Sequence, residues 1–384
     1  MPPMLDRALG VLAFAALLAV AGSAPAQPLA SDQVAQDQTA AREAPKKSLA
    51  WHDSSLLWVQ RTTTQTLGVG PKPQSADPYY DWVFYLRPRY SLWENDTSSL
   101  SVRGQLELDH EFTNSDTTTE KHETLLGDSV LAVVPEHAFV SHGEYLTLLS
   151  LSLPRLVLPT ATASYNAGNI AQLGVRAFLL QDLPLRENES WFPRARLALR
   201  AGYSYQFARY VVPELSTLNQ VRMDLEGHSV SNNQIAGAAL PEHLFILHGL
   251  AGADIWRNVI GFDAEFGIDP AIRFPLQEHT LLDFPLTGPY EVQNVDRPQR
   301  YGVLTLLDVY VEARALDNAF HVALGYENIT NQLAPASTYR SPLWSPDAHF
   351  YLRLEFVPDL LLEPPPPAAP RAGPAPGRHV ASAR

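Results

Sequence analysis

The stretch 100–112 alternates between two kinds of side chain. Small or apolar residues, with one histidine, occupy its even positions: Leu100, Val102, Gly104, Leu106, Leu108, His110 and Phe112. Polar and charged residues occupy its odd positions: Ser101, Arg103, Gln105, Glu107, Asp109 and Glu111. Because successive side chains of a β-strand point to opposite sides, this period of two predicts a strand with one apolar and one charged face. A soluble sheet with one face on a core can show the same pattern, so one strand does not separate it from a membrane barrel.

Eleven further segments alternate in a similar way. They span residues 54–67, 80–93, 127–140, 145–157, 171–181, 194–207, 243–256, 259–268, 301–314, 319–329 and 347–356. The alternation is weakest in 54–67 and in 127–140, where a threonine run and Pro135 interrupt it. Parity predicts that Leu106, Leu199 and Phe262 face lipid, whereas Gln105, Arg200 and Asp263 face the interior.

The connections between these segments fall into two classes of length. The first class is mostly short and comprises 94–98, 141–144, 184–193, 257–258 and 317–318. The second class, which alternates with it, is mostly longer and comprises 68–79, 113–124, 158–170, 211–242, 275–300 and 331–346. Short turns at one end and long loops at the other are the layout of bacterial outer-membrane barrels. The sequence therefore predicts an all-β fold, a transmembrane antiparallel up-and-down β-barrel of about 12 strands.

The two longest connections, 211–242 and 275–300, carry a separate expectation. Loops of this length are usually functional or disordered. We expect them to fold partly into the outer mouth of the barrel.

The two ends of the chain differ from its middle. Arg7 precedes an apolar run over 8–20, and small residues follow up to Ala26, which is typical of a secretion signal. We expect a signal peptide at 1–26, a flexible periplasmic leader at 27–52, the transmembrane barrel at 53–357 and a Pro-rich disordered tail at 358–384. No stretch after the signal is long and apolar enough for a membrane-spanning helix, so membrane insertion would have to use strands.

Composition excludes several classes of protein. The chain has no cysteine, which excludes a disulfide scaffold, a cysteine-ligated metal and a lipid anchor on cysteine. Its formal net charge of −13 argues against nucleic acid as a partner.

Charged residues of inward parity form the candidate site. We expect the following to line the lumen: Arg87, Arg89, Arg103, Glu107, Asp109, Arg194, Arg196, Arg200, Asp263, Glu265, Asp308, Glu312, Arg314, Arg353 and Glu355. Two interpretations remain open, because a polar lumen permits both. The charges either form a salt-bridged plug that holds the wall, or they line a hydrated path for solutes.

Motifs for catalysis or metal binding are weak. The segment 202–206 resembles a nucleophile elbow, but it lies within a strand and lacks the final glycine. His248 with Asp254, or His321 with Glu327, would suit acid–base chemistry in an outer-membrane hydrolase. The Glu–His pairs of the chain form no His-Glu-x-x-His pattern, so we expect no metal site.

Three parts of the sequence resemble outer-membrane barrels. The closing strand 349–356 is similar to their C-terminal signal strand, which alternates hydrophobic residues and ends on an aromatic, here Phe356; unlike that signal, it is followed by a tail. The segments 325–331 and 345–346 resemble the last hairpins of TonB-dependent receptors and some porins. Gly127-Asp128 with 151–153 and 158–160 resembles small uptake barrels of the phenol meta-pathway type.

Pattern and resemblance together indicate a passive channel or small-solute uptake protein in the outer membrane of a Gram-negative bacterium. The expected partners are membrane lipid, a small-molecule solute and the barrel-insertion machinery, with no cofactor and no catalytic residue. An outer-membrane hydrolase (lipase- or esterase-like) and a surface structural or adhesive barrel remain as alternatives.

Overall fold

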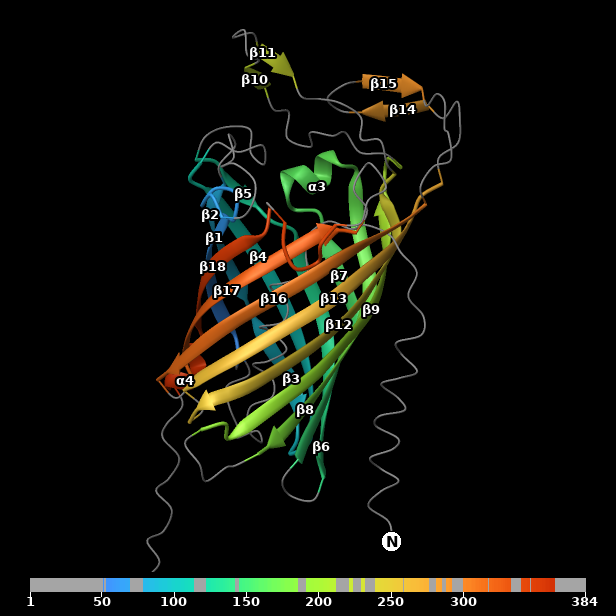
Figure 1. The fold of residues 1–384 in the computed structure, drawn as a ribbon. Helices are drawn as coiled ribbons and strands as arrows, with labels where there is room; N and C mark the ends of the chain where they lie inside the picture. Colours follow the sequence, from blue (N-terminus) through green and yellow to red (C-terminus); the bar gives the residue numbers. More distant parts are fainter. Residues whose placement is uncertain are drawn as a thin grey trace, which may run out of the picture.

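The structure is a computed structural model that describes residues 51, 53–69, 79–113, 122–141, 145–185, 191–211, 221–223, 229–231, 239–257, 259–275, 281–284, 288–291, 300–316, 318–332, 340–345 and 347–362. Its main sheet closes into a barrel (Figure 1). The strands of this sheet are β1 (Ser55–Thr63), β2 (Tyr80–Arg87), β3 (Arg89–Glu94), β4 (Ser98–Glu111), β5 (Thr124–Leu126), β6 (Ser129–Ser141), β7 (Tyr145–Leu158), β8 (Asn169–Pro184), β9 (Arg194–Ala208), β12 (Pro241–Trp256), β13 (Ile260–Arg273), β16 (Tyr301–Ala315), β17 (Phe320–Asn331) and β18 (His349–Phe356).

Twelve antiparallel strands make up the barrel wall. β2 and β3 are two parts of one strand interrupted at Pro88, since both pair with β4, and β5 is a three-residue piece paired with β4. The remaining neighbours follow chain order, and β1 pairs with β18 from Leu56↔Phe356 to Thr63↔His349 to close the ring. The predicted up-and-down barrel of about 12 strands is confirmed, including the weak segments that became β1 and β6.

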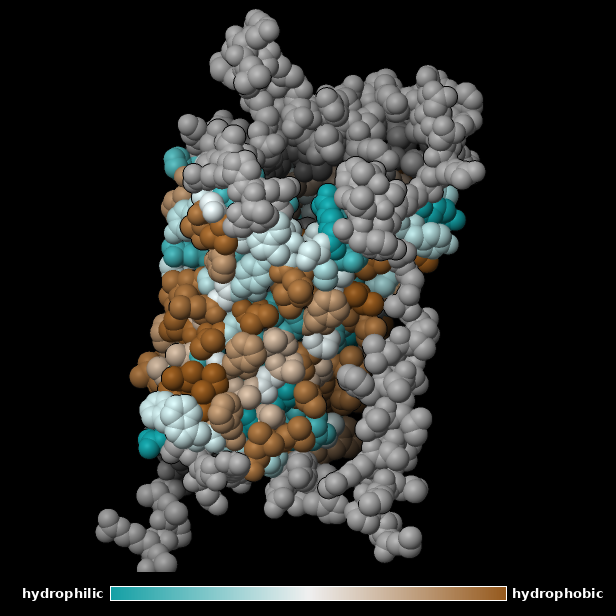
Figure 2. Space-filling view, in the orientation of Figure 1, coloured by the Kyte–Doolittle hydropathy of each residue, from teal (hydrophilic) through white to brown (hydrophobic). Residues whose placement is uncertain are grey.

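Inner and outer faces follow the predicted parity. On the outer face Leu106 and Phe262 are 51% and 38% exposed. On the inner face Gln105, Arg200 and Asp263 are 5%, 4% and 0% exposed. Apolar side chains dominate the middle of the face shown in Figure 2, whereas hydrophilic side chains gather towards the end that carries the short helix α3 (Thr162–Asn166).

The two ends of the barrel differ as the connection lengths predict. A short helix and two short hairpins stand at one end (Figure 1): α3, the hairpin of β10 (Val221–Met223) and β11 (Ser229–Ser231), and the hairpin of β14 (Leu281–Phe284) and β15 (Gly288–Glu291). Both hairpins lie beyond the rim, so these two parts of the longest connections do not enter the mouth. Most of the remainder of those connections lies outside the described residues.

Helix α3 is held against the barrel end by Asp128. The Oδ2 atom of Asp128 accepts a hydrogen bond of 2.6 Å from Ser164 Oγ, and its Oδ1 accepts one of 3.1 Å from the backbone N–H of Ala161. Burial raises the pKa of Asp128, although these two hydrogen bonds oppose the rise. Part of the expected loop 158–170 is therefore an anchored helical turn.

At the opposite end the short helix α4 (Asp359–Leu362) follows β18. Ordered structure thus continues a few residues past 357, the boundary expected for the barrel, and the rest of the expected Pro-rich tail lies outside the described residues. The expected signal peptide and nearly all of the leader lie outside them too. No helix among the described residues is long and apolar enough to cross a membrane.

Candidate functional site

Most of the predicted inward charges lie deep in the barrel. Ten of them are at most 9% exposed: Arg87, Arg89, Arg200, Asp263, Glu265, Asp308, Glu312, Arg314, Arg353 and Glu355. The side chains of Arg103 and Arg196 are 11% and 14% exposed, and Glu107 and Asp109 are half-buried. Arg194 differs from the rest because its side chain, at the start of β9, is 45% exposed. It forms an ion pair of 3.6 Å with Asp182.

One ion-pair network joins the inner faces of β9, β12, β13, β16, β17 and β18, and Glu312 lies at its centre. The carboxylate of Glu312 is 2.7 Å from Arg314 Nε, 3.1 Å from His321 Nδ1 and 3.3 Å from Arg353 Nη2. Arg314 also contacts Asp254 at 2.7 Å. Arg196 extends the network, since it lies 3.4 Å from both Asp254 and Asp263.

His248 bridges two carboxylates in a neighbouring part of the interior. Its Nδ1 is 2.6 Å from Glu265 Oε1, and its Nε2 is 2.7 Å from Asp269 Oδ1. Arg200 reaches the same Glu265 oxygen at 3.5 Å. Because a buried charge is costly unless it is paired, these contacts stabilise the charged inner face.

A second group of ion pairs lies on β1, β2, β3, β4 and β6. Arg61 pairs with Asp81 at 2.5 Å and with Asp109 at 3.4 Å. Glu136 forms ion pairs with Arg89 at 2.8 Å and with Arg103 at 2.6 Å. The inner charges are thus cross-linked between strands, which braces the wall.

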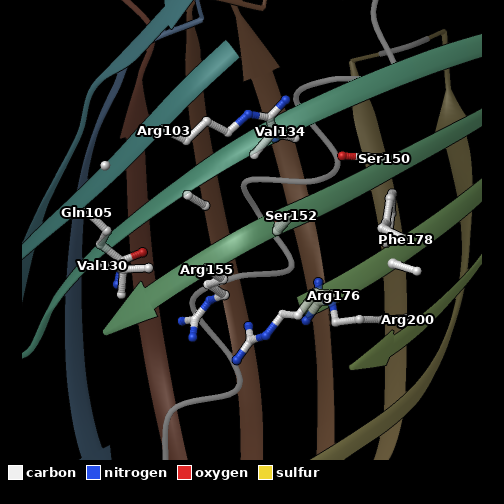
Figure 3. A pocket seen from close by; sticks show the side chains of 13 residues that line it. Arg103, Gln105, Val130, Val134, Ser150, Ser152, Arg155, Arg176, Phe178 and Arg200 are labelled. Atoms are coloured by element: carbon white, nitrogen blue, oxygen red, sulfur yellow. The ribbon is translucent and has the colours of Figure 1, made fainter. Parts of the chain in front are cut away.

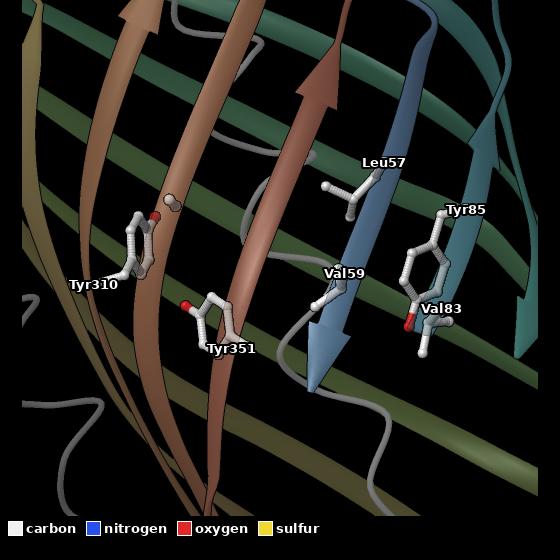
Figure 4. Packing of buried hydrophobic residues seen from close by; sticks show 7 residues of the cluster. Leu57, Val59, Val83, Tyr85, Tyr310 and Tyr351 are labelled. Carbon is white, nitrogen blue, oxygen red and sulfur yellow. The ribbon is translucent and has the colours of Figure 1, made fainter. Parts of the chain in front are cut away.

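Apolar and aromatic side chains fill another part of the interior, along β1, β2, β16, β17 and β18 (Figure 4). They are Leu57, Val59, Val83, Tyr85, Tyr310, Ala323 and Tyr351. Tyr351 donates a hydrogen bond of 2.7 Å to Asp308, and the Arg353 guanidinium lies 4.4 Å from the centre of the Tyr310 ring. The sequence did not predict this cluster, because alternation indicates only that a side chain faces inward. It does not show which inward side chains of different strands pack together.

An open space of about 550 Å³ remains beside β4, β6, β7, β8 and β9, and part of it is continuous with solvent. Arg103, Arg155, Arg176 and Arg200 project into it (Figure 3). We call this space the arginine cavity. No residue of the Glu312 network lines it.

The structure does not assemble the hydrolase arrangements considered from the sequence. His248 contacts Glu265 and Asp269 instead of Asp254, and His321 contacts Glu312 and the Asn318 carbonyl instead of Glu327. Each proposed partner lies six residues along the same strand, about 20 Å away at the rise of a β-strand. Ser204 lies within β9 on its inner face. Among the described residues, no group of His, Asp and Glu side chains is arranged to hold a metal ion.

Some inward charges were not in the predicted set. Glu136, 7% exposed, lies on the poorly alternating strand with Pro135, which obscured its parity. Arg155, 5% exposed, was missed because the pairing of β7 shifts between Ser152 and Arg155. Pro154, in the middle of β7, was the sequence signal for this shift, since proline within a sheet often marks a bulge.

Comparison with known proteins gives distant structural neighbours only. No protein-family model matches the chain, and no curated protein matches its sequence. An outer-membrane channel from Pseudomonas putida F1 shares 12% identity over 82% of this chain and 100% of that one, with a TM-score of 0.45. The NanC porin shares 6% identity over 79% of this chain and 98% of that one, with a TM-score of 0.32. A mutant of the monoaromatic hydrocarbon channel TodX shares 9% identity over 79% of this chain and 87% of that one, with a TM-score of 0.33. These identities and TM-scores are low, so the neighbours do not establish a function for this chain.

Proposed function

We propose that the protein is a passive channel for small solutes in the outer membrane of a Gram-negative bacterium. The observation that carries this proposal is a closed barrel whose outer face exposes leucine and phenylalanine while its inner face holds charges and an open cavity. The core of a bilayer has no water to form hydrogen bonds with backbone groups, so strands can cross it only as a closed barrel. A polar interior then offers solutes a path that the hydrocarbon does not.

We propose that the predicted inward charges act as the lining of this path. Of these charges Arg103 and Arg200 line the arginine cavity, so the proposed path runs beside β4, β6, β7, β8 and β9, where this cavity lies. Conduction by this route involves no chemical step and no cofactor. The proposed partners are membrane lipid on the outer face and a small solute inside.

We also propose the barrel-insertion machinery as a partner. β18 (His349–Phe356) alternates Phe350, Leu352 and Leu354 outward with Tyr351 and Arg353 inward, and it ends on Phe356. The strand that closes the barrel therefore carries the pattern of a terminal insertion signal.

Planar-bilayer recording tests the channel. The refolded protein should give small discrete conductance steps, and Phe178→Ala should enlarge them, because Phe178 lines the arginine cavity and is 4% exposed. Phe207→Ala is the matched control, since Phe207 lies on the outer face of β9 and is 45% exposed.

The rival function is a closed structural barrel, and one observation favours it. Asp263, Asp308 and Glu265 are at most 2% exposed, as in a filled interior. If the unchanged protein and Phe178→Ala both fold and neither conducts, the channel proposal is wrong and the structural barrel is the better account.

A further inference from the structure

His248 is a buried histidine whose two ring nitrogens both face carboxylate oxygens. Its side chain is 2% exposed, with Nδ1 2.6 Å from Glu265 Oε1 and Nε2 2.7 Å from Asp269 Oδ1. Such short separations are typical of hydrogen bonds between charged groups. We call these three side chains the His248 bridge, because they join the inner face of β12 to that of β13.

Hydrogen-bond chemistry determines how many protons the His248 bridge holds. A neutral imidazole has one N–H donor and one acceptor nitrogen, whereas an ionised carboxylate only accepts. Two ionised carboxylates can therefore both be bonded only if each ring nitrogen carries a hydrogen. With a neutral ring, one nitrogen and one carboxylate oxygen would face each other as two acceptors at 2.6 or 2.7 Å. The arrangement thus requires one proton more than a neutral histidine between two carboxylates.

The imidazole ring is a better place for this proton than either carboxyl group. An ordinary histidine releases its proton at about pH 6.5, whereas aspartic and glutamic acids do so at about pH 4. Arg200 favours the ionised form of Glu265, because its guanidinium lies 3.5 Å from the Oε1 atom that His248 also contacts. The ring is then a cation between two carboxylates.

Charges on every neighbouring strand bear on this assignment. On β9, Arg200 lies directly opposite His248, and a like charge in that position opposes a cationic ring. On β13 the two carboxylates of the bridge favour it, and on β16 the acidic Asp308 lies opposite Glu265. On β12 itself Asp254 is six residues along the strand, about 20 Å away. Among the described residues, two carboxylates in direct contact therefore act against one facing guanidinium.

The backbone of β13 leaves room for the ring between the two carboxylates. Gly267 lies opposite His248 in the pairing of β12 with β13, and a Cβ atom there would collide with the ring. The ring therefore lies against β13, with Glu265 on one side of the glycine and Asp269 on the other. Both hydrogen bonds depend on this position.

We propose that His248 is held as an imidazolium cation and that the His248 bridge is a proton-dependent brace of the barrel wall. A neutral ring can donate to only one of the two carboxylates, so loss of the proton leaves the other without its bond in a buried place, which is costly. The brace borders the arginine cavity, because Arg200 both lines that cavity and contacts Glu265. This inference concerns the wall itself and does not depend on the proposed channel function.

The stability that the bridge contributes should fall as the pH rises. In the unfolded chain a histidine releases its proton at about pH 6.5. Above that pH the folded protein binds one proton more than the unfolded chain, until the bridge releases it. The contribution is therefore fully present below about pH 6.5 and is lost as the pH rises through the point of release in the folded protein.

Nitrogen NMR of the full chain, labelled at histidine and refolded in detergent, measures the protonation directly. The His248 signals are those that disappear in His248→Gln. We expect both ring nitrogens to carry hydrogen at about pH 7.5, one unit above the release from an ordinary histidine, and release to follow in alkaline solution. A neutral ring at that pH would overturn the proposal, and a ring still doubly protonated at about pH 10, near the release from lysine, would overturn its pH dependence.

Asp269→Asn separates a proton site from a histidine that only fills space. An asparagine amide can donate as well as accept, so a neutral ring then satisfies both of its partners. His248 should therefore release its proton at least about one pH unit lower than in the unchanged protein. Release at the same pH would contradict the bridge. The same shift identifies the His248 signals if His248→Gln does not fold.

Urea unfolding in lipid vesicles, at one pH below and one above the release seen by NMR, measures the brace. His248→Gln should raise the unfolding equilibrium constant about tenfold at the lower pH, as expected for a lost hydrogen bond to a charged group, and much less at the higher pH. His243→Gln is the matched control on β12, because His243 Nδ1 lies 2.8 Å from the Tyr203 hydroxyl, which can itself donate. An equal effect of His248→Gln at both pH values, or the same pH dependence in His243→Gln, would overturn the brace.

Discussion

At two places on the inner wall, a glycine lies opposite a polar residue of the neighbouring strand. His248 lies opposite Gly267, and Asp263 lies opposite Gly252, in the pairing of β12 with β13. A Cβ atom at either glycine would collide with the facing side chain. At these two positions the polar side chain can lie along the inner wall because the opposite residue has no side chain.

Gly267→Ala tests this dependence. The added methyl group should push the His248 ring from its position between Glu265 and Asp269, and overpacking of this kind costs about 1–3 kcal/mol of unfolding free energy. Urea unfolding in lipid vesicles measures the change. Gly249→Ala is the control, because no atom lies within 4 Å of a Cβ at Gly249. Equal effects of the two substitutions would contradict the role given to the close approach.

At the scale of elements, α4 fastens the two strands that close the barrel. The backbone N–H of Val357 donates to the Ala319 carbonyl at 2.9 Å. Asp359 accepts a hydrogen bond of 2.6 Å from the backbone N–H of Asp53, just before β1, and the Asp53 carboxylate pairs with Arg89 at 2.7 Å. The end of β18 is thereby joined to the start of β1 and to β3.

We predict that Asp359→Ala loosens this junction. Its loss leaves the Asp53 N–H without its acceptor, which costs about 1–3 kcal/mol when the donor is buried and less where water can replace the carboxylate. Faster hydrogen exchange at β1 and β18, relative to β8, would report the loosening. Leu361→Ala is the control, because this side chain on the same helix is 49% exposed, and it should leave hydrogen exchange unchanged. Equal exchange rates at β1, β18 and β8 in Asp359→Ala would contradict a local role of Asp359 at this junction.

For the whole molecule, closure and the apolar outer face act together. A closed barrel has no free edge, so it resists unfolding in detergent, and its outer face must match hydrocarbon. Leucine, phenylalanine and tyrosine side chains on that face are 37–65% exposed at positions such as Tyr90, Leu106 and Leu324. Exposure of this extent is costly in water and favourable in lipid.

Leu106→Arg should therefore impair folding into vesicles by about 2–4 kcal/mol if position 106 lies near the bilayer midplane. The folded protein should migrate differently on a gel before and after boiling, and the fraction of the unboiled form measures folding. Leu67→Arg is the control, since Leu67 is 54% exposed beyond the end of β1. Identical migration with and without boiling would be evidence against a closed barrel in the refolded protein.

The sequence by itself determined the twelve strands, their order and the direction of most side chains. A strand's period of two is a local property, so Leu106 outward and Gln105 inward follow from neighbours in the chain. The tight connections, such as the one after Trp256, likewise fix which strands are adjacent. These features survive in the structure because no distant contact is needed to define them.

Only the tertiary structure decided which charges meet and where space remains. Ion pairs form between strands, so they depend on the register of strand pairing and on glycines such as Gly267, which leaves room for His248. His248 thus meets Glu265 and Asp269 on β13, and not Asp254 on its own strand, because side chains on the next strand are a few ångströms away while those six positions along are far out of reach. The arginine cavity is likewise formed by five neighbouring strands, β4, β6, β7, β8 and β9, which no local pattern contains.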